Sequence, residues 1–150
     1  MKTKRFISFL VIPVLFPIFI FSQDIAVHKM IGKSTATVIQ KYGKPVHQDN
    51  SNPSMVCMFY QNQTKRMIFV SNKNGVYQSE ATATYNTESS ARSDIDKFIS
   101  ASVSDGFGID TISINDFFLQ KPGTKVDLQL SENKINKIFE VNVKARKSED

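Results

Sequence analysis

SNKNGVYQSEATATY, residues 71–85, contains the two signals on which the predicted fold depends. The dipeptide Asn74-Gly75 favours a tight hairpin turn, because both residues readily adopt a positive φ. The residues that follow alternate between the two faces of a strand. One predicted face carries Tyr77, Ser79, Ala81, Ala83 and Tyr85, and the more polar face carries Val76, Gln78, Glu80, Thr82 and Thr84. This stretch therefore predicts the second arm of an antiparallel hairpin.

Two apolar runs upstream supply partners for this strand. SMVCMFY (54–60) and KRMIFV (65–70) are rich in residues that favour strands, and the turn-like QNQT separates them. We expect these runs to form a three-stranded antiparallel meander with residues 76–85. The polar stretch HQDNSNPS (47–54) is predicted to be a loop.

A short helix is predicted before this meander, in GKSTATVIQKYGKP (32–45). Ser34 or Thr35 supplies a hydroxyl that can cap the first turn. Gly43 permits the left-handed residue that commonly ends a helix, and Pro45 prevents its continuation. The residues expected to pack this helix on the sheet are Val38, Ile39 and Tyr42.

The same stretch is not a phosphate-binding loop. A P-loop needs a glycine five positions before its second glycine, Gly32, and Val27 occupies that position. We therefore interpret the glycines as helix boundaries. The lysines expected to face water without cradling a phosphate are Lys33, Lys41 and Lys44.

The order of a helix followed by strands then recurs. Residues 91–103 carry a helical apolar stripe, formed by Ala91, Ile95, Phe98 and Ile99, which ends at the polar Ser102. SDGFGID (104–110) is expected to be a loop. Three further strands are predicted at 112–120, 125–131 and 134–144, with Pro122-Gly123 as a type II turn. The predicted fold class is α+β: a helix followed by an antiparallel three-stranded meander, occurring twice, in half-repeats 24–86 and 87–144.

The first 22 residues predict export. Three basic residues precede a run, Phe6 to Phe21, that is apolar apart from Ser8 and two prolines, and the run is short for a membrane span. Ser22 offers the small residue of a signal-peptide cleavage site, so we expect the mature chain to begin at Gln23. Residues 23–150 would then be a single periplasmic or secreted domain that does not span the membrane. Retention of residues 1–22 as an uncleaved anchor is the alternative.

Composition excludes some classes of function. The whole chain has a formal net charge of +5, but the leader holds three of the 19 Lys and Arg and none of the 14 Asp and Glu. The remaining 16 basic and 14 acidic residues give only +2, without the basic face that nucleic-acid binding needs. Cys57 is the only cysteine. An exported domain with one cysteine has no internal disulfide, and we expect Cys57 to be buried in its apolar run.

No catalytic, cofactor-binding or metal-binding residue is predicted. His28 and His47 have no HExxH pattern and no cysteine partner, and a zinc site needs three or four converging ligands, so structural or surface roles are favoured. Asp105 and Asp110 lack the spacing and closing glutamate of a calcium loop. Thr111 remains a candidate for modification, because DTI at 110–112 resembles the acceptor of periplasmic O-glycosylation in some Gram-negative lineages.

The frame I-G-x-[ST]-x-x-x-V-x-x-x-Y-G-x-P, from Ile31 to Pro45, resembles a family of small periplasmic modules. These are typified by the outer-membrane assembly lipoproteins of the SmpA/OmlA type and by the β-lactamase inhibitor protein. The matching positions are Gly32, Ser34, Val38, Tyr42, Gly43 and Pro45. The resemblance implies a helix packed on an antiparallel sheet, a Gram-negative periplasm and binding to other proteins without catalysis. The chain departs from the family in lacking a lipid-bearing cysteine and the inhibitor's cysteine pairs.

These observations together predict an exported, non-enzymatic module that binds a protein at the cell envelope, with no cofactor. One alternative is an inhibitor of an exported enzyme, and another is a small ligand-binding cup formed by a curved sheet. A small hydrolase or metal-dependent enzyme is the alternative that the residues favour least.

Overall fold

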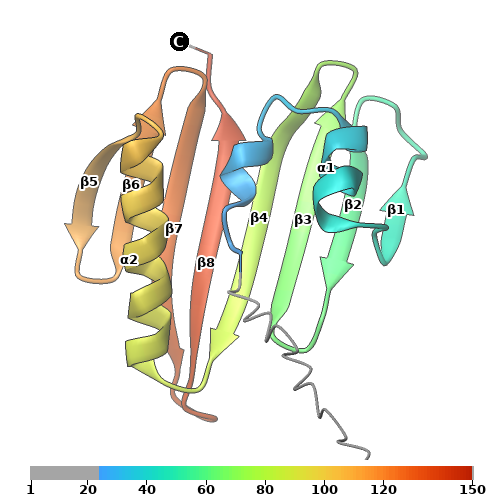
Figure 1. Cartoon of the computed structure of the whole chain (residues 1–150). Helices are drawn as coiled ribbons and strands as arrows, with labels where there is room; N and C mark the ends of the chain where they lie inside the picture. The colour runs from blue at the N-terminus through green and yellow to red at the C-terminus, as the bar shows by residue number, and fades with distance from the viewer. Residues whose placement is uncertain (1–23, 150) are drawn as a thin grey trace, which may run out of the picture.

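One antiparallel sheet of eight strands forms the framework of the molecule (Figure 1). The structure is a computed structural model that describes residues 24–149. Its elements, in chain order, are η1 (Val27–Met30), α1 (Thr35–Tyr42), β1 (His47–Asp49), β2 (Val56–Gln61), β3 (Lys65–Asn72), β4 (Gly75–Tyr85), α2 (Glu88–Ser104), β5 (Gly108–Ser113), β6 (Asp116–Lys121), β7 (Thr124–Asn133) and β8 (Ile138–Lys147). The predicted signal peptide and its cleavage site at Ser22 and Gln23 lie outside the described residues.

The two halves of the chain meet in the middle of the sheet, where β4, the last strand before α2, pairs with β8, the last strand of the chain. The strand order is β1-β2-β3-β4-β8-β7-β6-β5, with every neighbouring pair antiparallel, so β4 and β8 are central and β1 and β5 are the edges. The α+β class with an antiparallel sheet is confirmed. The predicted repeat of a helix with a three-stranded meander is wrong, because α1 and α2 are each followed by four strands and all eight strands form one continuous sheet.

Two strands were not predicted. β1 lies inside the stretch predicted to be a polar loop, and β5 overlaps the predicted loop 104–110. The predicted strand 112–120 is divided by a turn at Ile114 and Asn115, where the backbone N–H of Asn115 donates to the Ser113 hydroxyl (3.2 Å). Both missed strands are edge strands, and they lack the apolar alternation that marks a strand with one buried face.

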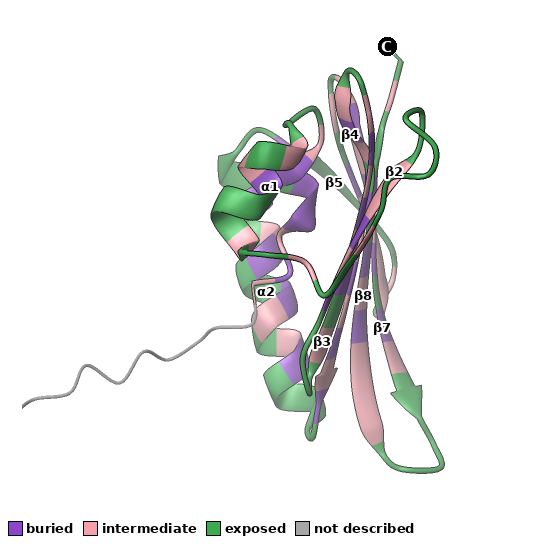
Figure 2. Ribbon diagram, turned by 90° about the vertical axis from the view of Figure 1, so that its right-hand side faces the viewer, coloured by how far each residue is buried: buried purple, intermediate pink, exposed green. Residues whose placement is uncertain are grey.

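All helical segments cover the same face of the sheet (Figure 2). α1 lies over β2 and β3, η1 contacts β4 and β8, and α2 crosses the other half of the sheet (Figure 1). The Ser79 hydroxyl donates to the Val27 carbonyl (3.0 Å), which fixes η1 on the central strand β4. The hydrophobic core lies between this layer and the sheet, and its largest fully buried side chains include Phe69, Met58, Leu119 and Leu128.

Helix α1 has the predicted bounds and caps. The Ser34 side chain accepts a hydrogen bond from the Thr37 N–H, and Gly43 ends the helix with a φ of 80°. Val38 is fully buried and Tyr42 packs against the core, as predicted, whereas Ile39 is 38% exposed. The short helix therefore rests on the sheet along a narrower stripe than the sequence predicts.

The hairpin turn before β4 is confirmed, but the strand carries a bulge near its start. Ser71 pairs with Val76 and Val70 pairs with Gln78, which leaves Tyr77 as an extra residue. The extra residue reverses the alternation, so Val76 shares the buried face with Ser79 and the following odd-numbered residues. The predicted faces are therefore correct from Gln78 to Tyr85 and wrong at Val76 and at the extra residue Tyr77.

No helix among residues 24–149 has both the length and the apolar character needed to cross a membrane.

Candidate functional site

The face of the sheet opposite the helices is not covered by any element of residues 24–149 (Figure 2). Since side chains alternate along a strand, each strand presents half of its residues on this uncovered face. The strand registers place one continuous row of side chains across all eight strands: His47, Phe59, Ile68, Glu80, Lys144, Asp127, Phe118 and Asp110. The row is apolar on β2 and β3 and charged on β4, β8 and β7, and a further aromatic residue, Phe118, follows on β6.

Four residues of β2 and β3 form an apolar block on the uncovered face. Phe59 pairs with Ile68, and Cys57 pairs with Val70 in the neighbouring row. All four are half-buried, although no helix lies over them. The prediction that Cys57 is buried in the core is wrong, because its strand turns Met58 and Tyr60, not Cys57, toward the helices.

Next to the apolar block, β4, β8 and β7 carry a ladder of alternating charges. Glu80 faces Lys144, which in turn faces Asp127, so unlike charges are neighbours across three strands. Arg146 donates a hydrogen bond to the Asp127 carboxylate, and both side chains are about half exposed. Ion pairs this exposed contribute little stability. Such charges are better suited to selecting a partner by complementarity.

His28 has the structural role predicted for it. It is buried, and its ring lies edge-on to Phe98 (centroids 4.7 Å apart) and Phe107 (5.3 Å). The ring Nε2 lies 3.3 Å from the Ser102 hydroxyl, whereas Nδ1 has no hydrogen-bond partner among the described residues. Burial lowers the pKa of His28 to about 4, and the positive charge of Lys29 adds to this effect. The imidazole is therefore neutral at neutral pH.

The other predicted candidates are distributed over separate parts of the surface. His47 is exposed on β1, where its ring lies 5.6 Å from that of Phe59. Asp105 forms an ion pair with Lys29 (2.8 Å), and this partner holds the pKa of its carboxyl below the usual range. Asp110 instead lies opposite Phe118 on the edge strand, so the structure does not join the two aspartates in one site. Thr111 is exposed on β5 and stays a candidate for modification.

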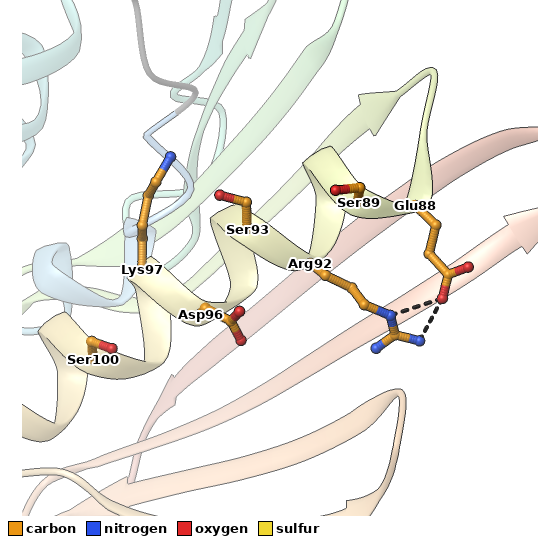
Figure 3. Close-up of a pocket in the computed structure, with 7 residues that line it drawn as sticks. All are labelled: Glu88, Ser89, Arg92, Ser93, Asp96, Lys97 and Ser100. Carbon is orange, nitrogen blue, oxygen red and sulfur yellow. Dashed lines mark hydrogen bonds and ion pairs between the residues drawn. The ribbon is translucent and has the colours of Figure 1, made fainter.

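A shallow groove follows the outer surface of α2 (Figure 3). All of its lining residues belong to this one helix, so it is an open helix surface and not an enclosed site. Its Arg92 pairs with Glu88 and also donates to the Ile114 carbonyl (3.1 Å), which ties the β5–β6 turn to α2. In residues 24–149, no three His, Cys, Asp or Glu side chains are grouped as metal ligands.

Two clefts open on the helical side. The first, of about 260 Å³, lies between η1 and α2 beside His28. The two lysines that line it are already paired with carboxylates, Lys29 with Asp105 and Lys97 with Asp94. The second, of about 440 Å³, lies between the end of α1 and strands β2 and β3. Lys41 and Lys44 are exposed, as predicted, but they also line this second cleft together with Lys65, which the sequence did not indicate.

Comparisons with known proteins do not define a family. No family model and no curated protein matches the chain. A solved cysteine-rich secretory protein from Staphylococcus aureus is similar to 77% of this chain, with 9% identity and a TM-score of 0.43. An extracellular protein containing an SCP domain, from Bacillus anthracis, is similar to 97% of it, with 12% identity and a TM-score of 0.44. The chain spans 44% and 49% of these two proteins, and the scores are too low for either function to bear on this chain.

Proposed function

We propose that this protein is an exported, non-enzymatic binding module of the cell envelope, and that a folded protein partner docks on the uncovered face of its sheet. The observation that carries this proposal is the composition of that face. An apolar block of Cys57, Phe59, Ile68 and Val70 stands directly beside a ladder of alternating charges, while the helices of residues 24–149 lie on the opposite side.

The apolar block supplies affinity in this proposal. Burying a large apolar side chain contributes roughly 1.5–3 kcal/mol, and hot spots of protein interfaces concentrate in such patches. The side chains stand on strands that pair on both sides, so the surface is ordered before the partner arrives. The partner would offer an apolar residue to Phe59 and Ile68.

The charge ladder supplies specificity. A partner with a carboxylate opposite Lys144 and a cation opposite Glu80 would match it, and a partner with the charges exchanged would be repelled. This arrangement selects one orientation on the sheet.

The cellular setting is part of the same proposal. The basic and apolar leader favours export, and the resemblance of residues 31–45 to periplasmic modules favours a Gram-negative periplasm and a protein partner. These two arguments for the cellular location do not depend on the uncovered face of the sheet. The location and the binding surface can therefore be tested separately.

The experiment is a capture from envelope extracts with matched variants. Ile68→Ser and Lys144→Glu alter the uncovered face, while Ile39→Ser and Lys33→Glu make the same chemical changes at exposed positions in α1 and just before it. Quantitative mass spectrometry compares the proteins that each variant retains. We expect one protein to be held by the wild type and both control variants and lost with both sheet variants. A partner held by the sheet variants and lost with the controls would place binding on the helical side and contradict the proposal.

A further inference from the structure

The cleft at the end of α1 gathers three lysines from separate segments. Lys41 lies in the last turn of α1, Lys44 follows that helix, and Lys65 begins β3. They line a volume of about 440 Å³ together with Asp24, Tyr42 and Tyr60. The fold therefore brings together cations that are distant in the sequence.

The charges in this cleft are not balanced. Asp24 supplies the one carboxylate of the lining, and it pairs with Lys41 (3.1 Å). Lys65 donates to the backbone carbonyl of Asp24 (3.1 Å), a neutral acceptor. Lys44 has no ion pair among the described residues. Asp24 is thus the one carboxylate that offsets the three lysines of the lining, and it pairs directly only with Lys41. Burial lowers the pKa of Lys65, although the nearby Asp24 charge opposes this effect, and a bound anion would oppose it further.

A buried hydroxyl points to the same chemistry. The Tyr42 hydroxyl is shielded from solvent and has no hydrogen-bond partner among residues 24–149. The ring packs against Tyr60 and Phe69, with centroids 6.0 Å and 5.2 Å away, and these contacts fix the position of the hydroxyl oxygen. Burial raises the pKa of Tyr42, so the hydroxyl keeps its proton and can donate a hydrogen bond. A buried donor without an acceptor is costly, and an oxygen anion that reached the hydroxyl through a small shift of the cleft lining would supply the acceptor.

We propose that this cleft binds a small oxygen anion, a phosphate or carboxylate group, with Lys44 and Lys65 supplying charge and the Tyr42 hydroxyl donating a hydrogen bond. The Asp24 carboxylate pairs with Lys41 at one wall of the cleft, so we expect the anion to bind on the side of Lys44 and Lys65. The C-terminal end of α1 is near, and just beyond it the Tyr60 hydroxyl donates to the carbonyl of the C-cap residue Gly43 (3.0 Å). This inference does not depend on the sheet face binding a partner.

The test uses isothermal titration of the exported chain with inorganic phosphate and, separately, with citrate. Lys44→Gln, Lys65→Gln and Tyr42→Phe alter the cleft, and Lys33→Gln removes the same charge before α1, outside the cleft lining. We expect Lys44→Gln and Lys65→Gln to weaken binding about tenfold each, in line with one charge-assisted hydrogen bond. Tyr42→Phe should also weaken it, and Lys33→Gln should change affinity by less than about twofold.

A second arm identifies the source of the anion. Vesicles of a zwitterionic lipid, with and without an anionic phospholipid, are sedimented with each variant. Binding to anionic vesicles that is lost with Lys44→Gln assigns a lipid headgroup, whereas saturable binding of free phosphate or citrate alone assigns a soluble ligand. Absence of binding in every arm overturns the inference, and so does an equal loss with Lys33→Gln and Lys44→Gln. Lys44→Gln remains informative if Lys65→Gln fails to fold, because Lys44 has no ion pair within residues 24–149.

Discussion

The imidazole of His28 and the hydroxyl of Ser102 meet at 3.3 Å in the interior and join η1 to α2. His28 is 4% exposed and Ser102 is fully buried, so water does not compete for this contact. The packing of His28 against Phe98 and Phe107 requires an uncharged ring, because a buried cation among aromatic and aliphatic groups would lose its hydration.

The stability of the protein should therefore depend on pH through His28. Its pKa is about 4 in the folded state and 6.5 when unperturbed, so the unfolded state binds the proton first. The contribution of the neutral His28 ring to the free energy of unfolding is complete above pH 6.5 and declines as the pH falls to about 4. It amounts to at most about 3 kcal/mol. Chemical denaturation at a series of pH values measures this decline.

A matched pair of variants separates the effect of His28 on the pH dependence of stability from that of the other histidine, His47. His28→Gln should flatten the curve between pH 6.5 and 4, whereas His47→Gln, at an exposed position on β1, should leave the wild-type slope. The pKa values of Asp24 and Asp105 are lowered from 3.8 in the folded state. Their effect on the free energy of unfolding is therefore lost below about pH 3.8, outside the range from pH 6.5 to 4 in which His28 titrates. Parallel curves for the wild type and His28→Gln would refute the assignment.

The sequence predicted most of α2 but not this contact. The apolar stripe of the helix ends at Ser102, which indicated that the helix leaves the core at that point. In the structure Ser102 is buried and continues the stripe, because its polar partner His28 lies 74 positions away in the chain. Periodicity identifies apolar faces, and it gives no sign of a buried polar pair between distant segments.

The unequal burial of two neighbouring residues of α1 predicts that they contribute unequally to stability. Val38 is fully buried and its neighbour Ile39 is 38% exposed. Val38→Ala should lower the free energy of unfolding by about 1–3 kcal/mol, because it leaves a small cavity under the helix. Ile39→Ala should cost less than about 1 kcal/mol. Equal losses in thermal or chemical denaturation would show that α1 does not pack as described.

Gly75 should be the least replaceable of the turn glycines. Its φ is +103°, and an added β-carbon would stand 2.8 Å from the Lys33 carbonyl oxygen and 2.9 Å from that of Gly32. Gly106 has a similar φ of +88° with no atom within 4 Å of that position. Gly106→Ala should lower the free energy of unfolding by about 1 kcal/mol, because only the positive φ opposes the new side chain. Gly75→Ala should lower the free energy of unfolding by at least about 2 kcal/mol more than Gly106→Ala, because the backbone of Gly32 and Lys33 must move. Similar melting temperatures for the two variants would contradict this close approach.

The edges of the sheet and the uncovered face were the least predictable features. β1 has three residues, and it is a strand because β2 lies beside it, with Asp49 opposite Cys57. The bulge at Tyr77 also depends on a neighbouring strand, since it is defined by pairing with β3. The charge ladder joins β4, β7 and β8, so it could not be assembled before the strand order was known. The apolar block joins β2 and β3, which the sequence predicted as neighbours, but the sequence did not show that its face of the sheet is uncovered.

Export gives a prediction that concerns residues outside the described fold. Cleavage between Ser22 and Gln23 would leave Asp24 in place, where it accepts a hydrogen bond from the Ala26 N–H (2.9 Å) and pairs with Lys41. We expect the intact mass of the exported protein to correspond to a chain that begins at or within a few residues of Gln23. Full-length chain recovered from the inner membrane would instead support the uncleaved anchor.

The central claim is that a partner protein docks on the uncovered face, and site-specific photocrosslinking in intact cells tests it most directly. A photoreactive phenylalanine analogue is placed at Phe59, at Phe118 or at Ile39, the last being exposed on α1. We expect the analogue at Phe59, in the apolar block, to crosslink to one envelope protein, the analogue at Phe118, beyond the charge ladder, to give the same product, and the analogue at Ile39 to give none. Crosslinks to that protein from Ile39, with none from Phe59 or Phe118, would contradict the central claim.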